Sequence, residues 1–149
     1  MELYRRMKKL TYIFILLFCT GCSSDEPVSE VPYLEFISVN PQQVQAFEDN
    51  LIFTIFYQDG NGDLGENSPD IKNLFLKDNR NDIVYEYRIK QLAPDDVNIY
   101  IQGKLNIELS GTGITDGSPE QSATFDIYVV DKAGNNSNTI TSSNIIISQ

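Results

Sequence analysis

The sequence predicts an all-β protein, folded as a sandwich of about seven antiparallel strands. Three observations support this prediction. Short apolar stretches alternate with polar residues at the two-residue period of a strand, and turn-forming residues bound these stretches. No window keeps a helical period for long. Apolar residues make up 41% of the 149 residues, which is enough for a core and too many for a disordered chain.

The first 21 residues have the composition of an export signal. Basic residues stand at positions 5, 6, 8 and 9, and an apolar run follows at 10–18. That run is too short to span a bilayer and has the length of a signal core. The string Cys19-Thr20-Gly21-Cys22 resembles the bacterial lipobox, although Cys19 stands where Leu is usual. The resemblance implies cleavage before Cys22 and a lipid on Cys22, which anchors the chain to a membrane.

Cleavage before Cys22 would change the charge and the cysteine count. It would remove four of the 11 basic residues and one of the 21 acidic residues, leaving 7 and 20 and a formal net charge of −13. Cys22 would be the only cysteine left, so no intramolecular disulfide is possible. The strong negative charge argues against nucleic acid as a partner.

Residues 22–32 are expected to form a flexible tether after the lipidated cysteine. They are polar, acidic and contain proline, a composition that keeps a segment extended. An acidic run at this place also resembles the surface-export signal of Bacteroidetes-type lipoproteins. A plain spacer and an export signal both stay open.

The remaining residues, 33–149, form the predicted domain. The candidate strands, each bounded by turn residues, are 33–39, 51–57, 73–77, 83–89, 98–109, 124–130 and 139–147. The second is apolar on both faces, as a central strand would be. The fifth is expected to bend at Gly103. In the sixth, Phe125, Ile127 and Val129 are expected to point inward.

Seven short strands in a domain of this length are typical of an immunoglobulin-like β-sandwich. The segment 125–135 ends in Asp131-Lys132-Ala133-Gly134-Asn135 and resembles the last strands of bacterial immunoglobulin-like and fibronectin type III-like modules. The whole domain resembles surface lipoproteins of Bacteroidetes type. This resemblance implies a fold and an outer-membrane location, exposed at the cell surface or facing the periplasm.

An acidic loop follows the second candidate strand. Asp59, Asn61 and Asp63 alternate with glycines, and Asp70 is the twelfth residue counted from Asp59. These are the spacings of ligands 1, 3, 5 and 12 of an EF-hand, in which oxygen atoms bind calcium. However, Leu64 stands where the EF-hand needs glycine, and a strand precedes the loop. The pattern therefore predicts EF-hand-like spacing in a loop between strands.

Two interpretations of this loop stay open. Asp-Gly and Asn-Gly are common turn sequences, so a plain turn explains the glycines. It does not explain the additional carboxylates, which repel one another unless something neutralises them. In an immunoglobulin-like sandwich the loop that contains Asp131 lies at the same end. Five ligands for calcium are then expected to meet there: Asp59, Asn61, Asp63, Asp70 and Asp131.

The sequence favours a binding function over catalysis. It contains no histidine, and lipid would block its last thiol, so the usual nucleophile–base pairs are absent. Tyr85 and Tyr87 share a strand face with Ile83 and Ile89, which favours core packing over a sugar-binding platform. We expect a non-catalytic, calcium-stabilised cell-envelope module that binds a glycan or a protein. The alternative is a structural accessory subunit of an outer-membrane assembly, without a ligand of its own.

Overall fold

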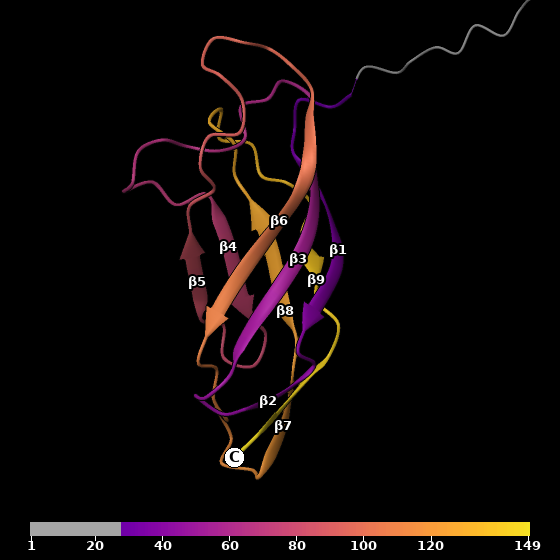
Figure 1. Cartoon of the computed structure of the whole chain (residues 1–149), viewed down its shortest axis with the longest axis vertical. Coiled ribbons are helices and arrows are strands. Elements are labelled where there is room, and N and C mark those ends of the chain that lie inside the picture. The colour runs from indigo at the N-terminus through magenta and orange to yellow at the C-terminus, as the bar shows by residue number, and fades with distance from the viewer. Residues whose placement is uncertain (1–27) are drawn as a thin grey trace, which may run out of the picture.

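The computed structural model describes residues 28–149, and the part of the chain it describes is all-β (Figure 1). The signal segment 1–21 and the lipidation site Cys22 lie outside the described residues. Within 28–149 no helix is long and apolar enough to cross a membrane. The strands are β1 (Tyr33–Asn40), β2 (Gln43–Gln45), β3 (Asn50–Asp59), β4 (Leu74–Asp78), β5 (Val84–Tyr87), β6 (Ile101–Ser110), β7 (Glu120–Ala123), β8 (Phe125–Val129), β9 (Ile140–Thr141) and β10 (Ile145–Ser148).

The strands form the two layers of a sandwich. One layer is the antiparallel sheet β1-β3-β6, in which β3 is central. The other contains the sheets β5-β4-β8-β9 and β2-β10-β7, in which only the β2–β10 pair is parallel. These two sheets are joined because β7 runs into β8 and β9 runs into β10. The register slips by one residue at that junction, where the Phe125 N–H donates to Ser142 Oγ at 2.9 Å.

The core lies between the layers and follows the two-residue alternation of the strands. Phe125, Ile127 and Val129 are fully buried, so the inward face predicted for this strand is confirmed. Phe125 meets Phe53 of the opposite layer edge-to-face, with 5.2 Å between ring centroids. Burying one such side chain contributes roughly 1.5–3 kcal/mol to the free energy of unfolding. This packing fixes how the two layers, and the loops at their ends, sit relative to one another.

Each of the seven predicted strands has a counterpart, and the additional strands are short. β2 and β7 were not predicted, and the last predicted strand is divided into β9 and β10. The expected bend at Gly103 is absent, because β6 stays in register with β3 from end to end. Gly103 has a different role, since a Cβ there would lie 2.8 Å from the Tyr57 hydroxyl. Tyr85 and Tyr87 pack against the core, as predicted.

The two lateral edges of the sandwich differ. On one edge Asn138 bridges the layers, because its Oδ1 accepts from the Leu34 N–H at 2.8 Å and its Nδ2 donates to the Leu34 carbonyl at 2.9 Å. On the other edge β5 and β6 each pair with a single neighbour. A cleft of about 420 Å³ lies there, with an apolar wall that includes Leu92, Leu105 and Ile107. One edge is therefore closed and the other open.

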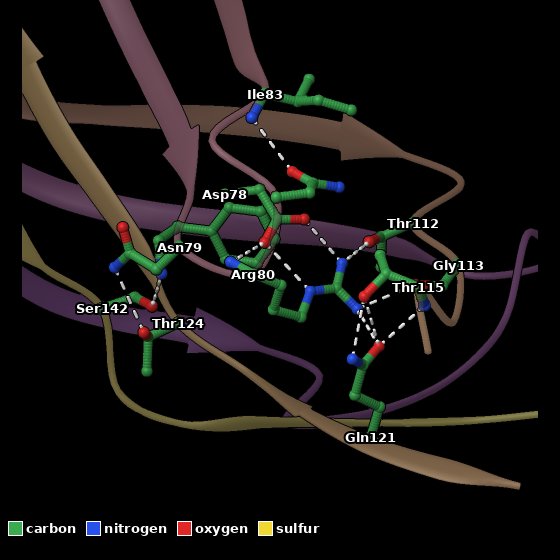
Figure 2. Close-up of polar contacts among 12 residues, drawn as sticks. Asp78, Asn79, Arg80, Ile83, Thr112, Gly113, Thr115, Gln121, Thr124 and Ser142 are labelled. Atoms are coloured by element: carbon green, nitrogen blue, oxygen red, sulfur yellow. Dashed lines mark hydrogen bonds and ion pairs between the residues drawn. The ribbon is translucent and has the colours of Figure 1, made fainter. Parts of the chain in front are cut away.

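A buried ion pair occupies the pole of the sandwich opposite the acidic loop. The Asp78 side chain is 1% exposed, and the Arg80 guanidinium contacts both of its carboxylate oxygens, at 3.0 and 2.6 Å. Arg80 also donates to Thr112 Oγ1, the Gly113 carbonyl and Gln121 Oε1 (Figure 2). The guanidinium thus joins the β4–β5 turn to the segments before and within β7. A buried charge pair whose hydrogen bonds are satisfied resists the loss of either partner.

We predict that Arg80→Met lowers the free energy of unfolding by about 3–5 kcal/mol, because it leaves the Asp78 carboxylate buried without its cation. Urea denaturation measures the change. Lys77→Met is the matched control, since Lys77 pairs with Asp82 in an exposed position and exposed ion pairs contribute little. Equal losses in the two variants would contradict a special role for Arg80.

Candidate functional site

Two acidic loops meet at one pole of the sandwich. β3 and β8 both end there, and the loops that follow them, 60–73 and 130–139, lie at the upper end of Figure 1. Backbone contacts join the loops directly. The Ala133 N–H donates to Asp63 Oδ2 at 3.2 Å, and the Lys132 N–H donates to the Asp63 carbonyl at 3.3 Å. Segments about 70 residues apart in sequence therefore form one site.

Asp59 is the innermost acidic residue of this site. It ends β3 and is 0% exposed. Its Oδ2 accepts a 2.8 Å hydrogen bond from the Leu64 N–H, whereas its Oδ1 is buried with no hydrogen-bond partner. Leu64 is itself 1% exposed, so its side chain anchors the loop in the core and holds its N–H against Asp59. A buried polar atom without a partner is uncommon and costly.

Asp63 and Asp131 complete the acidic cluster. Asp63 Oδ1 is also buried without a hydrogen-bond partner. Asp131 is 6% exposed, and its carboxylate accepts from the Asn135 N–H at 2.7 Å and from Asn135 Nδ2 at 2.8 Å. Asn135 thus fixes the orientation of Asp131. We define the acidic cluster as Asp59, Asp63 and Asp131.

The carboxylates of the acidic cluster repel one another. Burial raises the pKa of Asp59 above its ordinary value of 3.8, and the charge of Asp131 raises it further, against the hydrogen bond from Leu64. Burial also raises the pKa of Asp63, as do the charges of Asp131 and Asp59. Within 28–149 no ion pair reaches any of the three. A proton or a cation would relieve this repulsion.

Two predicted ligands have different surroundings. Asn61 lies in the turn between Asp59 and Asp63, and its Oδ1 accepts a long, 3.4 Å hydrogen bond from the Asp63 N–H. Asp70 is exposed, and among the described residues no hydrogen bond links it to the other four predicted ligands. At Gly65 φ is +107° and a Cβ would lie 2.5 Å from the Lys90 carbonyl oxygen, so this turn requires glycine. The glycine that an EF-hand has at position six stands here one residue later, at the turn.

The donor chemistry of the acidic cluster suits a hard cation. Within residues 28–149 no group of three or more His, Cys, Asp or Glu side chains forms a ready-made metal site. Two buried carboxylate oxygens nevertheless lack partners, and they belong to the same cluster. A hollow of about 120 Å³, lined in part by Glu66 and Lys132, opens beside Asp131. These oxygens are of the kind that calcium binds.

Sequence reasoning did not find several residues that build this site. It treated Leu64 only as a departure from the EF-hand pattern, although that residue is the anchor of the loop. It also assigned no role to Asn135, which orients Asp131. An apolar residue within a run of polar loop residues was the available signal for Leu64. The cleft at the open edge had no signal in the sequence, because it is formed where strands distant in the chain meet.

We predict that Asp59→Asn raises the free energy of unfolding by about 1–3 kcal/mol in the presence of a chelator, because it removes a buried, unpaired charge. A raised pKa in the folded state means that stability is lost as the pH rises through that pKa. The stability difference between Asp59→Asn and the wild type should therefore disappear as the pH falls toward 3.8, because the wild-type Asp59 carboxyl is then protonated and uncharged, like the amide. Asp70→Asn is the control and should change nothing, since Asp70 is exposed. A destabilised Asp59→Asn at neutral pH would contradict this account.

Comparison of the chain with models of protein families, with curated proteins and with solved structures finds no match.

Proposed function

We propose that this protein is a non-catalytic, lipid-anchored binding module of the cell envelope, stabilised by calcium. The observation that carries the proposal is the pair of buried carboxylate oxygens without partners, Asp59 Oδ1 and Asp63 Oδ1, in a cluster with Asp131. No basic side chain of residues 28–149 forms an ion pair with the cluster, so a cation from solution is the simplest way to offset its charge.

Calcium suits this cluster better than a softer metal. Calcium takes six to eight oxygen ligands from flexible loops and accepts carboxylates, carbonyls and water. Asp59, Asp63 and Asp131 would hold the ion, and Asn61 lies in the same turn. The bound ion would supply positive charge and so fix the two loops to each other. A small exported domain without a disulfide gains from such a link.

The proposed location in the cell envelope is based on the sequence. The lipobox-like string ending at Cys22 supports an acyl anchor, and the signal segment before it supports export. The formal net charge of −13 after cleavage argues against nucleic acid. A chain with no histidine and no free thiol after acylation lacks the Ser–His and Cys–His pairs of the usual nucleophilic enzymes, which supports a binding role.

A second function is favoured by the open edge of the sandwich. β5 and β6 end their sheets there, and the cleft between them has an apolar wall with Arg88 and Lys90 at its rim. Free strand edges pair readily with another chain. This arrangement supports the alternative, an accessory subunit that adds its edge to an outer-membrane assembly.

The thermal unfolding midpoint of the purified protein, measured with calcium and with chelator, tests the proposed cation. If calcium binds only the folded state, a hundredfold excess over its dissociation constant adds about 2.7 kcal/mol, a rise of roughly ten degrees. Asp63→Ala should abolish the rise. Asp82→Ala should keep it, since Asp82 is exposed at the opposite pole. An unfolding midpoint of the wild-type protein that is the same with calcium and with chelator would refute the proposed calcium binding.

Affinity purification from membranes separates the two functions. The accessory-subunit alternative predicts a stoichiometric membrane protein that is retained by wild type and lost from Asn106→Pro, which places a proline on the free edge strand β6. Gln102→Pro is the matched control at the far end of the same strand. Recovery of the protein alone would favour the free binding module.

A further inference from the structure

The chain that enters the domain is attached to the acidic pole. The Gly60 N–H donates to the Ser29 carbonyl at 3.0 Å, and a Cβ on Gly60 would lie only 2.4 Å from that oxygen. The Val31 N–H donates to Ser29 Oγ at 3.0 Å. The sequence predicts a flexible tether as far as residue 32, yet residues 28–32 pack on the loop that contains the acidic cluster. The point of attachment is therefore fixed at this pole.

A second segment contacts the same turn. The Ile99 N–H donates to the Asn61 carbonyl at 3.2 Å, and a Cβ on Gly62 would lie 2.5 Å from the Ile99 carbonyl oxygen. Gly60 and Gly62 thus let two segments approach the turn closely. In Figure 1 the loop between β5 and β6, to which Ile99 belongs, extends beyond the sandwich at the end where the chain enters.

Both segments carry exposed apolar side chains, which we name the apical apolar patch. Its members are Val28, Val31, Val97, Ile99 and Tyr100, each between 41% and 44% exposed. Phe47 and Ile83 are exposed at the other pole, so exposure alone does not identify a surface. What distinguishes the apical apolar patch is that the chain enters the domain through it.

The length of chain before the patch limits where a membrane can be. If Cys22 carries the lipid, six residue steps separate it from Val28, and they reach at most roughly 20 Å. The ten-residue strand β3 alone spans about 33 Å. A lipid in the bilayer therefore keeps the acidic pole close to the membrane surface, whereas the opposite pole can lie well above it.

We propose that the apical apolar patch lies in the interface of the bilayer that holds the lipid on Cys22. This inference rests on the anchor of the proposed function and adds the orientation of the domain. Transfer of valine and isoleucine side chains from water to the acyl boundary is favourable, and a tyrosine suits the interface because its hydroxyl keeps a polar partner, here Gln102 Oε1 at 2.6 Å. The lipid anchor and the apolar side chains reinforce each other. Because the segment between Cys22 and Val28 is short, the anchor keeps the apical apolar patch near the bilayer and so raises the effective concentration of the membrane at the patch. The acidic cluster then lies on the membrane side of the domain.

Tryptophan fluorescence tests the orientation, because the chain contains no tryptophan. The full chain is expressed with its leader, and the processed protein is reconstituted into vesicles of phosphatidylcholine with or without bromine on the acyl chains. Ile99→Trp places the probe in the patch. Ile83→Trp is the matched control, since Ile83 is 50% exposed at the opposite pole. Unfolding midpoints show whether each variant folds, and Val97→Trp replaces Ile99→Trp if that variant does not.

The expected result is that brominated lipid lowers the Ile99→Trp emission about twofold or more and leaves the Ile83→Trp emission unchanged. Equal emission changes in the two variants, or none in either, overturn the orientation. The intact mass of the same sample separates this failure from failure of the anchor. An acylated protein with no quenching refutes only the orientation, whereas a protein without an acyl group refutes the anchor and the orientation with it.

Discussion

The structure fully buries two aspartates, one at each pole, and the surroundings of their charges differ. Asp78 and Asp59 are both 0% exposed. Asp78 is paired with Arg80, whose guanidinium also fastens neighbouring segments together. Asp59 accepts a hydrogen bond from the Leu64 N–H, and the charges of Asp63 and Asp131 oppose its own. Among residues 28–149 an arginine thus pairs with the buried aspartate at one pole, and no basic side chain pairs with the acidic cluster at the other.

This difference distinguishes the acidic pole from a structural ion pair. Transfer of a carboxylate into the interior costs several kcal/mol unless a charge and hydrogen bonds offset it. The basic residue closest to the cluster in sequence, Lys132, pairs with the exposed Asp95 at 3.1 Å. Its backbone N–H, not its ammonium group, contacts Asp63. Within residues 28–149 the fold has therefore brought three acids together without an ion pair to any of them, which is the basis of the cation proposal.

The sequence predicted the strands and the meeting of the loops for one physical reason. Alternating side chains fix which face of each strand is buried, and two strands that end at the same pole bring their loops together. Asp131 was placed beside Asp59 and Asp63 in this way, after EF-hand-like spacing had singled out those two residues. Asp70 was placed with them by EF-hand spacing, which assumes a loop that curls around the ion. At Gly65 this loop instead passes so close to the Lys90 carbonyl that a Cβ would lie 2.5 Å from its oxygen, an approach between residues 25 positions apart that local spacing does not contain.

The acidic cluster lies at one pole of the domain, and the open edge lies along its side. The cluster shares its pole with the entering chain, so any cation bound there would also hold the loop against which Ser29 packs. Loss of the ion would loosen both the loop and the point at which the anchor joins the domain. The cleft between β5 and β6 lies along the side of the sandwich, and the Asn138 bridge closes the opposite side. A domain held to a membrane by its acidic pole would keep that open side free, so the proposed orientation leaves the strand edges β5 and β6 accessible to another chain.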